Sequence, residues 1–110
     1  MIDALIDDFL KMMLAEKGAS LNTIDAYRRD MLMFFDICKQ TNLRDITKQD
    51  VAVYVQKLSE FGYATRSIAR KVASLREFFK FLYTENKIKD NPALYLFPPK
   101  REKLLPKFLE

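Results

Sequence analysis

Two stretches of the chain carry small polar and cationic side chains at the spacing of one helix face. At about 100° per residue, such side chains in residues 65–86 gather on one side of a helix, and they are Arg66, Ser67, Arg70 and Ser74, with Lys71 on the flank. Residues 21–40 have a comparable face, made of Asn22, Thr23, Ala26, Arg29 and Met33. Cationic groups neutralise phosphates, and amides and hydroxyls hydrogen-bond phosphates or base edges. If the two helices cross, both faces could meet a duplex together, which predicts a surface for double-stranded DNA.

Both faces also have plainer explanations. A basic helix face is often only solvated, and Ser or Thr at a helix N-terminus can cap the helix without holding a phosphate. The face in residues 65–86 has no acid until Glu77, whereas solvated faces more often mix both signs. The residues alone leave two hypotheses open: a duplex-binding module, and a helical protein–protein interaction domain whose basic face is solvated or binds an acidic partner.

Catalytic chemistry lacks its usual residues in this sequence. The chain has no His and a single Cys, Cys38, so His-based acid–base catalysis, His metal ligation and a thiolate metal site are excluded. It contains no Walker loop, no GxGxxG and no GxSxG, and its acids show no carboxylate pairing. We therefore expect no catalytic residue, no metal site and no cofactor within these 110 residues.

The basic charge is concentrated in the second half of the chain. Residues 1–60 carry 8 Lys and Arg against 10 Asp and Glu, a net of −2, whereas residues 61–110 carry 11 against 5, a net of +6. The sum is the formal net charge of +4. Such an uneven distribution is typical of a polyanion-binding surface.

Apolar periodicity predicts an all-α fold of four helices and a short fifth one. The predicted helices cover residues 2–17, 21–40, 48–61 and 65–86, followed by a short turn of helix over 91–96. Ser20, Thr47 and Thr65 are the expected N-caps, and Gly18 and Gly62 the expected stops. The helix over 65–86 is long enough to form the central wall of a small bundle.

The last residues read as a linker. Phe97 is followed by paired prolines and mixed charge, and then by apolar residues without a partner. We expect a core helical domain over residues 1–97, and over 98–110 a linker with the start of a missing second domain. The sequence has no signal peptide and no apolar run near 18 residues, so the expected location is the cytoplasm, without a membrane contact.

The second predicted helix resembles a motif of the tyrosine recombinases. The pattern S-x-x-T-x-x-A-Y-x-x-D-[LM]-x-x-F-x-x-[FWI] is met here by Ser20, Thr23, Ala26, Tyr27, Asp30, Met31, Phe34 and Ile37. Further likenesses occur in order, at Ile46–Val51, at Arg66–Leu82 and from Asn91 to Pro106. They cover nearly the whole chain and resemble the N-terminal core-binding domain, a SAM-like helical bundle, of Xer-type recombinases and phage integrases.

The resemblance implies a function and a division of labour. In that family this domain clamps one side of a DNA recombination half-site, and a C-terminal catalytic domain closes on the other side. The nucleophilic Tyr and the Arg, His and Lys constellation belong to that second domain, so this chain would not itself be the enzyme. The implied partners are double-stranded DNA and other recombinase protomers, with a monomer when the domain is isolated. The implied process is DNA recombination, as DNA integration or chromosome dimer resolution.

The resemblance also carries DNA contacts onto particular positions. The matching residues are Thr23, Arg29, Ser67, Arg70 and Ser74, with Arg28 and Lys71 at the edge of the core. Helical spacing adds Asn22 and Arg66 to this set. We expect Arg29 and Arg70 to face the same side of the bundle, and Ser67 and Ser74 to be exposed there.

Overall fold

The computed structural model describes residues 2–39, 42–94 and 96. Their secondary structure is entirely helical, with α1 (Ile2–Glu16), α2 (Leu21–Cys38), a 3₁₀ turn η1 (Leu43–Asp45), α3 (Lys48–Glu60) and α4 (Thr65–Thr84). The predicted all-α bundle and its four α-helices are confirmed, each to within two residues at either end. In the described residues no strand occurs.

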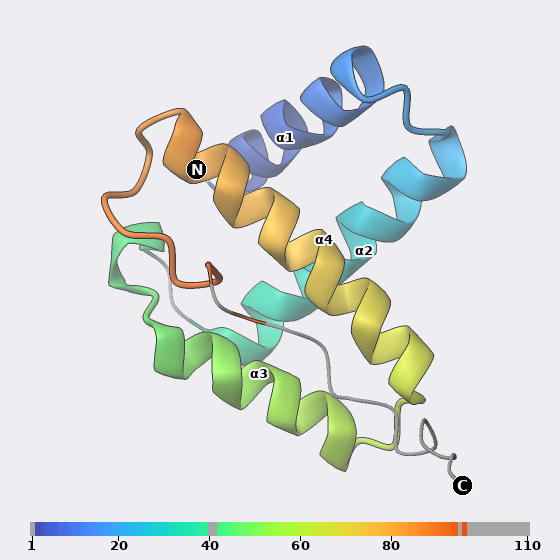
Figure 1. The fold of residues 1–110 in the computed structure, drawn as a ribbon, viewed down its shortest axis with the longest axis vertical. Coiled ribbons are helices and arrows are strands. Elements are labelled where there is room, and N and C mark those ends of the chain that lie inside the picture. Colours follow the sequence, from blue (N-terminus) through green and yellow to red (C-terminus); the bar gives the residue numbers. More distant parts are fainter. Residues whose placement is uncertain (1, 40–41, 95, 97–110) are drawn as a thin grey trace, which may run out of the picture.

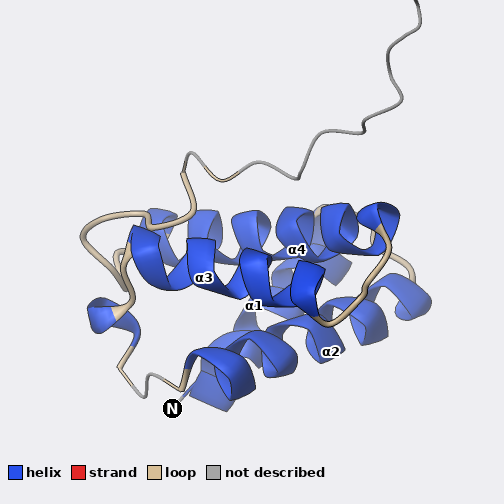
Figure 2. Cartoon of the chain, turned by 90° about the horizontal axis from the view of Figure 1, so that it is seen from below, coloured by secondary structure: helices blue, strands red, loops and turns tan. Residues whose placement is uncertain are grey.

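Helix α4 is the central wall of this bundle, as its length predicts. Figure 1 shows α4 running diagonally across α2, with α1 on one side and α3 on the other. In the turned view of Figure 2, α3 and α4 form the upper layer and α2 lies in the lower one. Both α2 and α4 contact all three of the other α-helices, so these two helices connect the whole bundle.

The apolar stripe of α4 forms much of the core. Its buried apolar side chains are Ile68, Val72, Leu75, Phe78, Phe79 and Leu82, whereas Tyr83 near its end is 52% exposed. Phe78 meets Phe9 of α1 edge to face, with ring centroids 5.3 Å apart, and Phe79 meets Phe34 of α2 in the same way at 5.9 Å. These ring pairs add to the free energy of simple area burial and tie α4 to both neighbours.

Short side-chain caps fix where two of the helices begin. Ser20 accepts a hydrogen bond from the Thr23 N–H at 3.1 Å, at the start of α2. Thr47 and Asp50 exchange the two hydrogen bonds of a capping box at the start of α3. The predicted cap at Thr65 is wrong, because α4 already includes Thr65 and its N-cap is Ala64, which has no side chain able to accept.

The chain after α4 turns back without a fifth helix in the described residues. Asn91 accepts a hydrogen bond from the Ala93 N–H at 2.9 Å, and the Leu94 N–H bonds to the Asn91 carbonyl at 3.3 Å. These bonds close turns over 91–94, where we expected a short helix through Leu96. The predicted linker over 98–110 lies outside the described residues. Among those that are described, no helix has both the length and the apolarity to cross a membrane.

Candidate nucleic-acid interface

A buried carboxylate joins α2 to α4 where the two helices cross. Asp30 is 1% exposed. Its Oδ1 accepts hydrogen bonds from Arg70 Nη2 and from Lys71 Nζ, each at 3.0 Å, and its Oδ2 accepts one from Ser74 Oγ at 3.2 Å. An isolated buried carboxylate is strongly unfavourable. The donors on α4 therefore make the burial of Asp30 tolerable and fix the register of the two helices.

Two of the predicted DNA-contacting side chains are buried, because Asp30 draws them inward. Lys71 is 6% exposed and Ser74 is fully buried. The Tyr63 ring lies over the Lys71 ammonium, with the nitrogen 5.1 Å from the ring centroid. Ser74 Oγ also lies 2.9 Å from the Lys71 carbonyl oxygen. Neither side chain can touch a duplex in this conformation, and the expectation of an exposed Ser74 fails.

Arg70 differs from its neighbours because it remains at the surface. Its side chain is 50% exposed while one Nη2 bonds to Asp30. A guanidinium has five N–H donors, so a single hydrogen bond to Asp30 leaves donors for a second anion. Arg70 bonds to Asp30, and Arg29 directly precedes Asp30 on α2. Both arginines therefore lie near the same helix crossing.

The remaining predicted side chains of α2 and α4 differ in exposure. Asn22, Arg29 and Arg66 are exposed, and Thr23 and Ser67 are half-buried. Among the ion pairs formed between described residues, none involves Arg29 or Arg66. These two cations are therefore available to a polyanion.

Arg28 points away from α4. It lies two residues before Asp30, and thus on the other side of α2. Its Nη1 pairs with Asp7 Oδ1 of α1 at 2.8 Å, with both side chains about half exposed. Arg28 therefore belongs to the α1–α2 contact, although sequence similarity groups it with the DNA-contacting residues.

Two tyrosines beside the Asp30 cluster are packing groups. Tyr27 stacks on Phe9, with ring centroids 6.2 Å apart. Burial raises the pKa of Tyr27, and the charges of Glu77 and Asp30 raise it further. The pKa of Tyr54 is also raised, first by burial and then by Asp30. Both phenols therefore lose their proton less readily than an exposed tyrosine.

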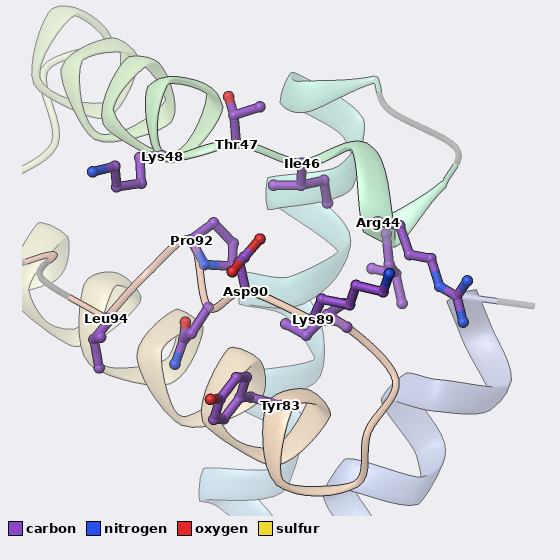
Figure 3. A pocket seen from close by; sticks show the side chains of 12 residues that line it. Arg44, Ile46, Thr47, Lys48, Tyr83, Lys89, Asp90, Pro92 and Leu94 are labelled. Atoms are coloured by element: carbon purple, nitrogen blue, oxygen red, sulfur yellow. The ribbon is translucent and has the colours of Figure 1, made fainter.

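A hollow in the surface of the described residues lies at the C-terminal end of α4. It encloses about 780 Å³ between the η1–α3 connection and the segment that follows α4. Figure 3 shows Arg44, Lys48 and Lys89 among its lining side chains, with Asp90 beside Pro92. Because Tyr83 near the C-terminus of α4 lines it, this hollow is separate from the surface around Arg66 and Arg70.

Sequence reasoning missed the two residues that organise the crossing. Asp30 was identified only as a motif position, and Tyr63 was not singled out. A signal for Asp30 is present, since it lies between Tyr27, Met31 and Phe34 on the apolar side of its helix, where an acid requires a partner. Tyr63 carries no comparable signal, because it lies in the turn before α4.

The geometry defines an all-α bundle in which exposed arginines surround one buried helix-to-helix ion cluster. The sequence model of the family described as "Phage integrase, N-terminal SAM-like domain" matches residues 6–86. The chain belongs to this family, which confirms the resemblance read from its motifs.

Curated relatives agree with this assignment. The chain is 38% identical over 106 residues to the tyrosine recombinase XerD of Brucella abortus, covering 94% of this chain and 34% of that protein. It is 39% identical over 108 residues to XerD of Rhizobium meliloti, covering 96% and 35%. It is 33% identical over 111 residues to the tyrosine recombinase XerC of Oceanobacillus iheyensis, covering 98% and 36%. The chain thus spans about a third of the length of these relatives, as an N-terminal recombinase domain.

Proposed function

We propose that this domain binds double-stranded DNA through the crossing of α2 and α4, as the N-terminal clamp of a tyrosine site-specific recombinase. The observation that carries the proposal is the group of exposed cations at this crossing, Arg29, Arg66 and Arg70. Asn22, Thr23 and Ser67 supply small hydrogen-bonding groups on the same two helices. A helix fits the major groove of B-DNA, and two crossed helices present their flanks to the same duplex.

The proposed contact set is smaller than the set predicted from the sequence. It leaves out Lys71 and Ser74, which are buried, and Arg28, which pairs with α1. Arginines dominate what remains, so phosphate contacts supply most of the affinity and the small polar groups fix the register. The isolated domain binds weakly, since it forms only one side of the clamp.

The wider function follows from the same proposal. Strand breakage and rejoining, at an integration site or a chromosome dimer site, belong to a catalytic domain that works together with this one. Other recombinase protomers are then further partners on the DNA. The competing function, an interaction domain for an acidic protein, would use the same cations but would not need groups that reach base edges.

Amide chemical shifts distinguish the two functions. On adding a duplex to the isotope-labelled domain, we expect shifts to cluster at residues 22–33 and 65–77, on the two sides of the crossing. Absent or diffuse shifts with DNA, together with clustered shifts on adding an acidic protein, would contradict the proposal.

Arg70→Ala tests the central contact. We expect duplex affinity to fall by about fivefold to tenfold at low salt, and the dependence on salt to become less steep, because one phosphate contact is lost. Lys11→Ala removes one charge from an exposed position on α1 and is the matched control. If both variants bound like the unchanged domain in a mobility-shift titration, Arg70 would not contact DNA.

A further inference from the structure

We propose that Lys71, although shielded from any ligand, determines how strongly this surface attracts DNA, because it neutralises Asp30 and thereby leaves the charge of Arg70 for a phosphate. This inference rests on the proposed function and assigns a positioning role to a residue that cannot touch the duplex. Two cations share the one carboxylate of Asp30.

The charges at the crossing do not balance. Asp30 carries one negative charge, and Arg70 and Lys71 carry one positive charge each, both bonded to the same Oδ1. Ser74 occupies the other oxygen. The cluster therefore has an excess of one positive charge, carried by whichever cation is paired less strongly with Asp30.

Exposure assigns the excess charge to Arg70. The Lys71 side chain is 8% exposed, whereas that of Arg70 is 50% exposed. An ion pair withdrawn from water is screened much less than one at the surface, so Lys71 is the stronger partner of Asp30. The Tyr63 ring covers the Lys71 ammonium and holds it in place. Lys71 is thus the counter-ion of Asp30. Arg70 donates a second hydrogen bond to a carboxylate whose charge Lys71 already neutralises.

Without Lys71 the roles change. Arg70 would be the only cation at Asp30, and a guanidinium can grip a carboxylate with two parallel hydrogen bonds. The surface would lose its excess charge, and a phosphate would have to compete with Asp30 for Arg70. We expect Lys71→Met, which keeps the length and the apolar stem of the side chain, to weaken duplex binding about fivefold.

A double-mutant cycle separates this role from a general loss of charge. In the Arg70→Ala background, we expect Lys71→Met to change duplex affinity by less than about twofold, because the Arg70 guanidinium that Lys71 leaves free for a phosphate is absent. Lys80→Met removes the same charge from an exposed position of α4 and should have a smaller effect than Lys71→Met in the unchanged background. Losses that simply multiply in the Arg70, Lys71 double variant would overturn the inference, as would a Lys71→Met variant that binds normally.

Removing both buried charges should restore binding. Asp30→Asn with Lys71→Met leaves Arg70 beside a neutral amide, so affinity should return to within about twofold of the unchanged domain. A double variant that folds, as judged by circular dichroism, but binds as weakly as Lys71→Met contradicts the mechanism. If Lys71→Met does not fold, NMR of the unchanged domain gives the test. On adding duplex, the Arg70 Nε–Hε signal should shift and the Lys71 ammonium signal should not, and the reverse result overturns the inference.

The outcomes also separate this inference from the proposed function. If the unchanged domain gives no clustered shifts with a duplex, both fail. If it binds at residues 22–33 and 65–77 and Arg70→Ala weakens binding, the proposed function stands. A failed cycle then counts against the role of Lys71 alone.

Discussion

Asp30 shows how a single side chain redistributes the polar groups around it. Helical spacing places Ser74 beside Arg70 on one face of α4, where it should be exposed, and Lys71 on the flank at the edge of the core. The carboxylate on the opposing helix turns Lys71 and Ser74 inward and leaves only Arg70 half outside. A buried ion cluster is weak evidence for net stability, since removing one partner is costly but replacing the whole cluster often is not. Its clearer effect is to fix which cation faces the solvent.

The Tyr54 side chain buries a polar group inside the bundle. Its hydroxyl is buried and has no hydrogen-bond partner among the described residues. A buried hydroxyl without a partner is unfavourable by about 1–3 kcal/mol, and the ring itself packs edge to face on Phe34. We therefore expect Tyr54→Phe to leave the free energy of unfolding unchanged or to raise it by about 1 kcal/mol, as measured by urea denaturation.

The pH dependence of the same variant gives an independent check. The pKa of Tyr54 is raised in the folded domain above the ordinary value of 10.0. Above about pH 10 the unfolded chain therefore loses this proton while the folded domain keeps it, so stability falls as the pH rises. Tyr54→Phe should lessen this alkaline loss, and Tyr83→Phe, at an exposed position, should not. A clear destabilisation at neutral pH would show that the hydroxyl has a partner in solution.

Helix ends in this bundle are set by different means. The α3 N-terminus is closed by the reciprocal bonds of Thr47 and Asp50, whereas α4 begins at Thr65 and its N-cap, Ala64, makes no side-chain hydrogen bond. Helix α4 tolerates this because its stability comes from a long apolar stripe that packs on three neighbours. Helix α3 is shorter and depends more on its first turn.

Paired threonines test this difference between the two helices. Thr47→Ala removes the side chain that accepts the Asp50 N–H bond, so we expect the free energy of unfolding to fall by about 1 kcal/mol. Thr65→Ala, made in the first turn of α4, removes no cap and introduces a better helix former, so it should be neutral or slightly stabilising. Urea unfolding of both variants decides the matter. Equal losses would mean that Thr65 supports α4 in a way that its position does not explain.

Helices α2 and α4 together carry three exposed arginines near the point where they cross. Exposed arginines at the α2–α4 crossing face no acid partner in the described residues other than Asp30, which Lys71 already neutralises. The pocket near Tyr83 is lined by its own cations but lies at the far end of α4. Since Arg29 and Arg66 lie on different helices, the charge is distributed for a ligand that spans both, as a duplex does.

The affinity for a duplex should depend steeply on the salt concentration. If Arg29, Arg66 and Arg70 each neutralise one phosphate, the logarithm of the association constant should fall with the logarithm of salt concentration at a slope of about −2.7. Between about 50 and 200 mM salt this amounts to a loss of roughly fortyfold in affinity. Fluorescence anisotropy with a labelled duplex measures the slope. A slope near zero would exclude phosphate contacts as the main source of binding.

The sequence alone determined the helices, most of their ends and the family. Apolar spacing, the Ser20 cap and the Thr47 box depend on residues a few positions apart, and local sequence contains that information. The errors at Thr65 and in the turn over 91–94 are of the same local kind. Thr65 is a favourable cap residue, but it already lies inside α4, whose N-cap is the residue before it. Asn91 is a favourable cap residue as well, but the chain after it closes turns where a short helix was expected.

Only the tertiary structure decided which polar side chains remain outside. Arg70, Lys71 and Ser74 lie 40, 41 and 44 residues from Asp30 in the chain, so no local window contains the carboxylate together with its donors. The helical angle assigns a side chain to a face, but burial depends on what the opposing helix offers to that face. Here the opposing helix offers a carboxylate, and for that reason two predicted surface groups are inside and Arg70 is left half exposed at the crossing.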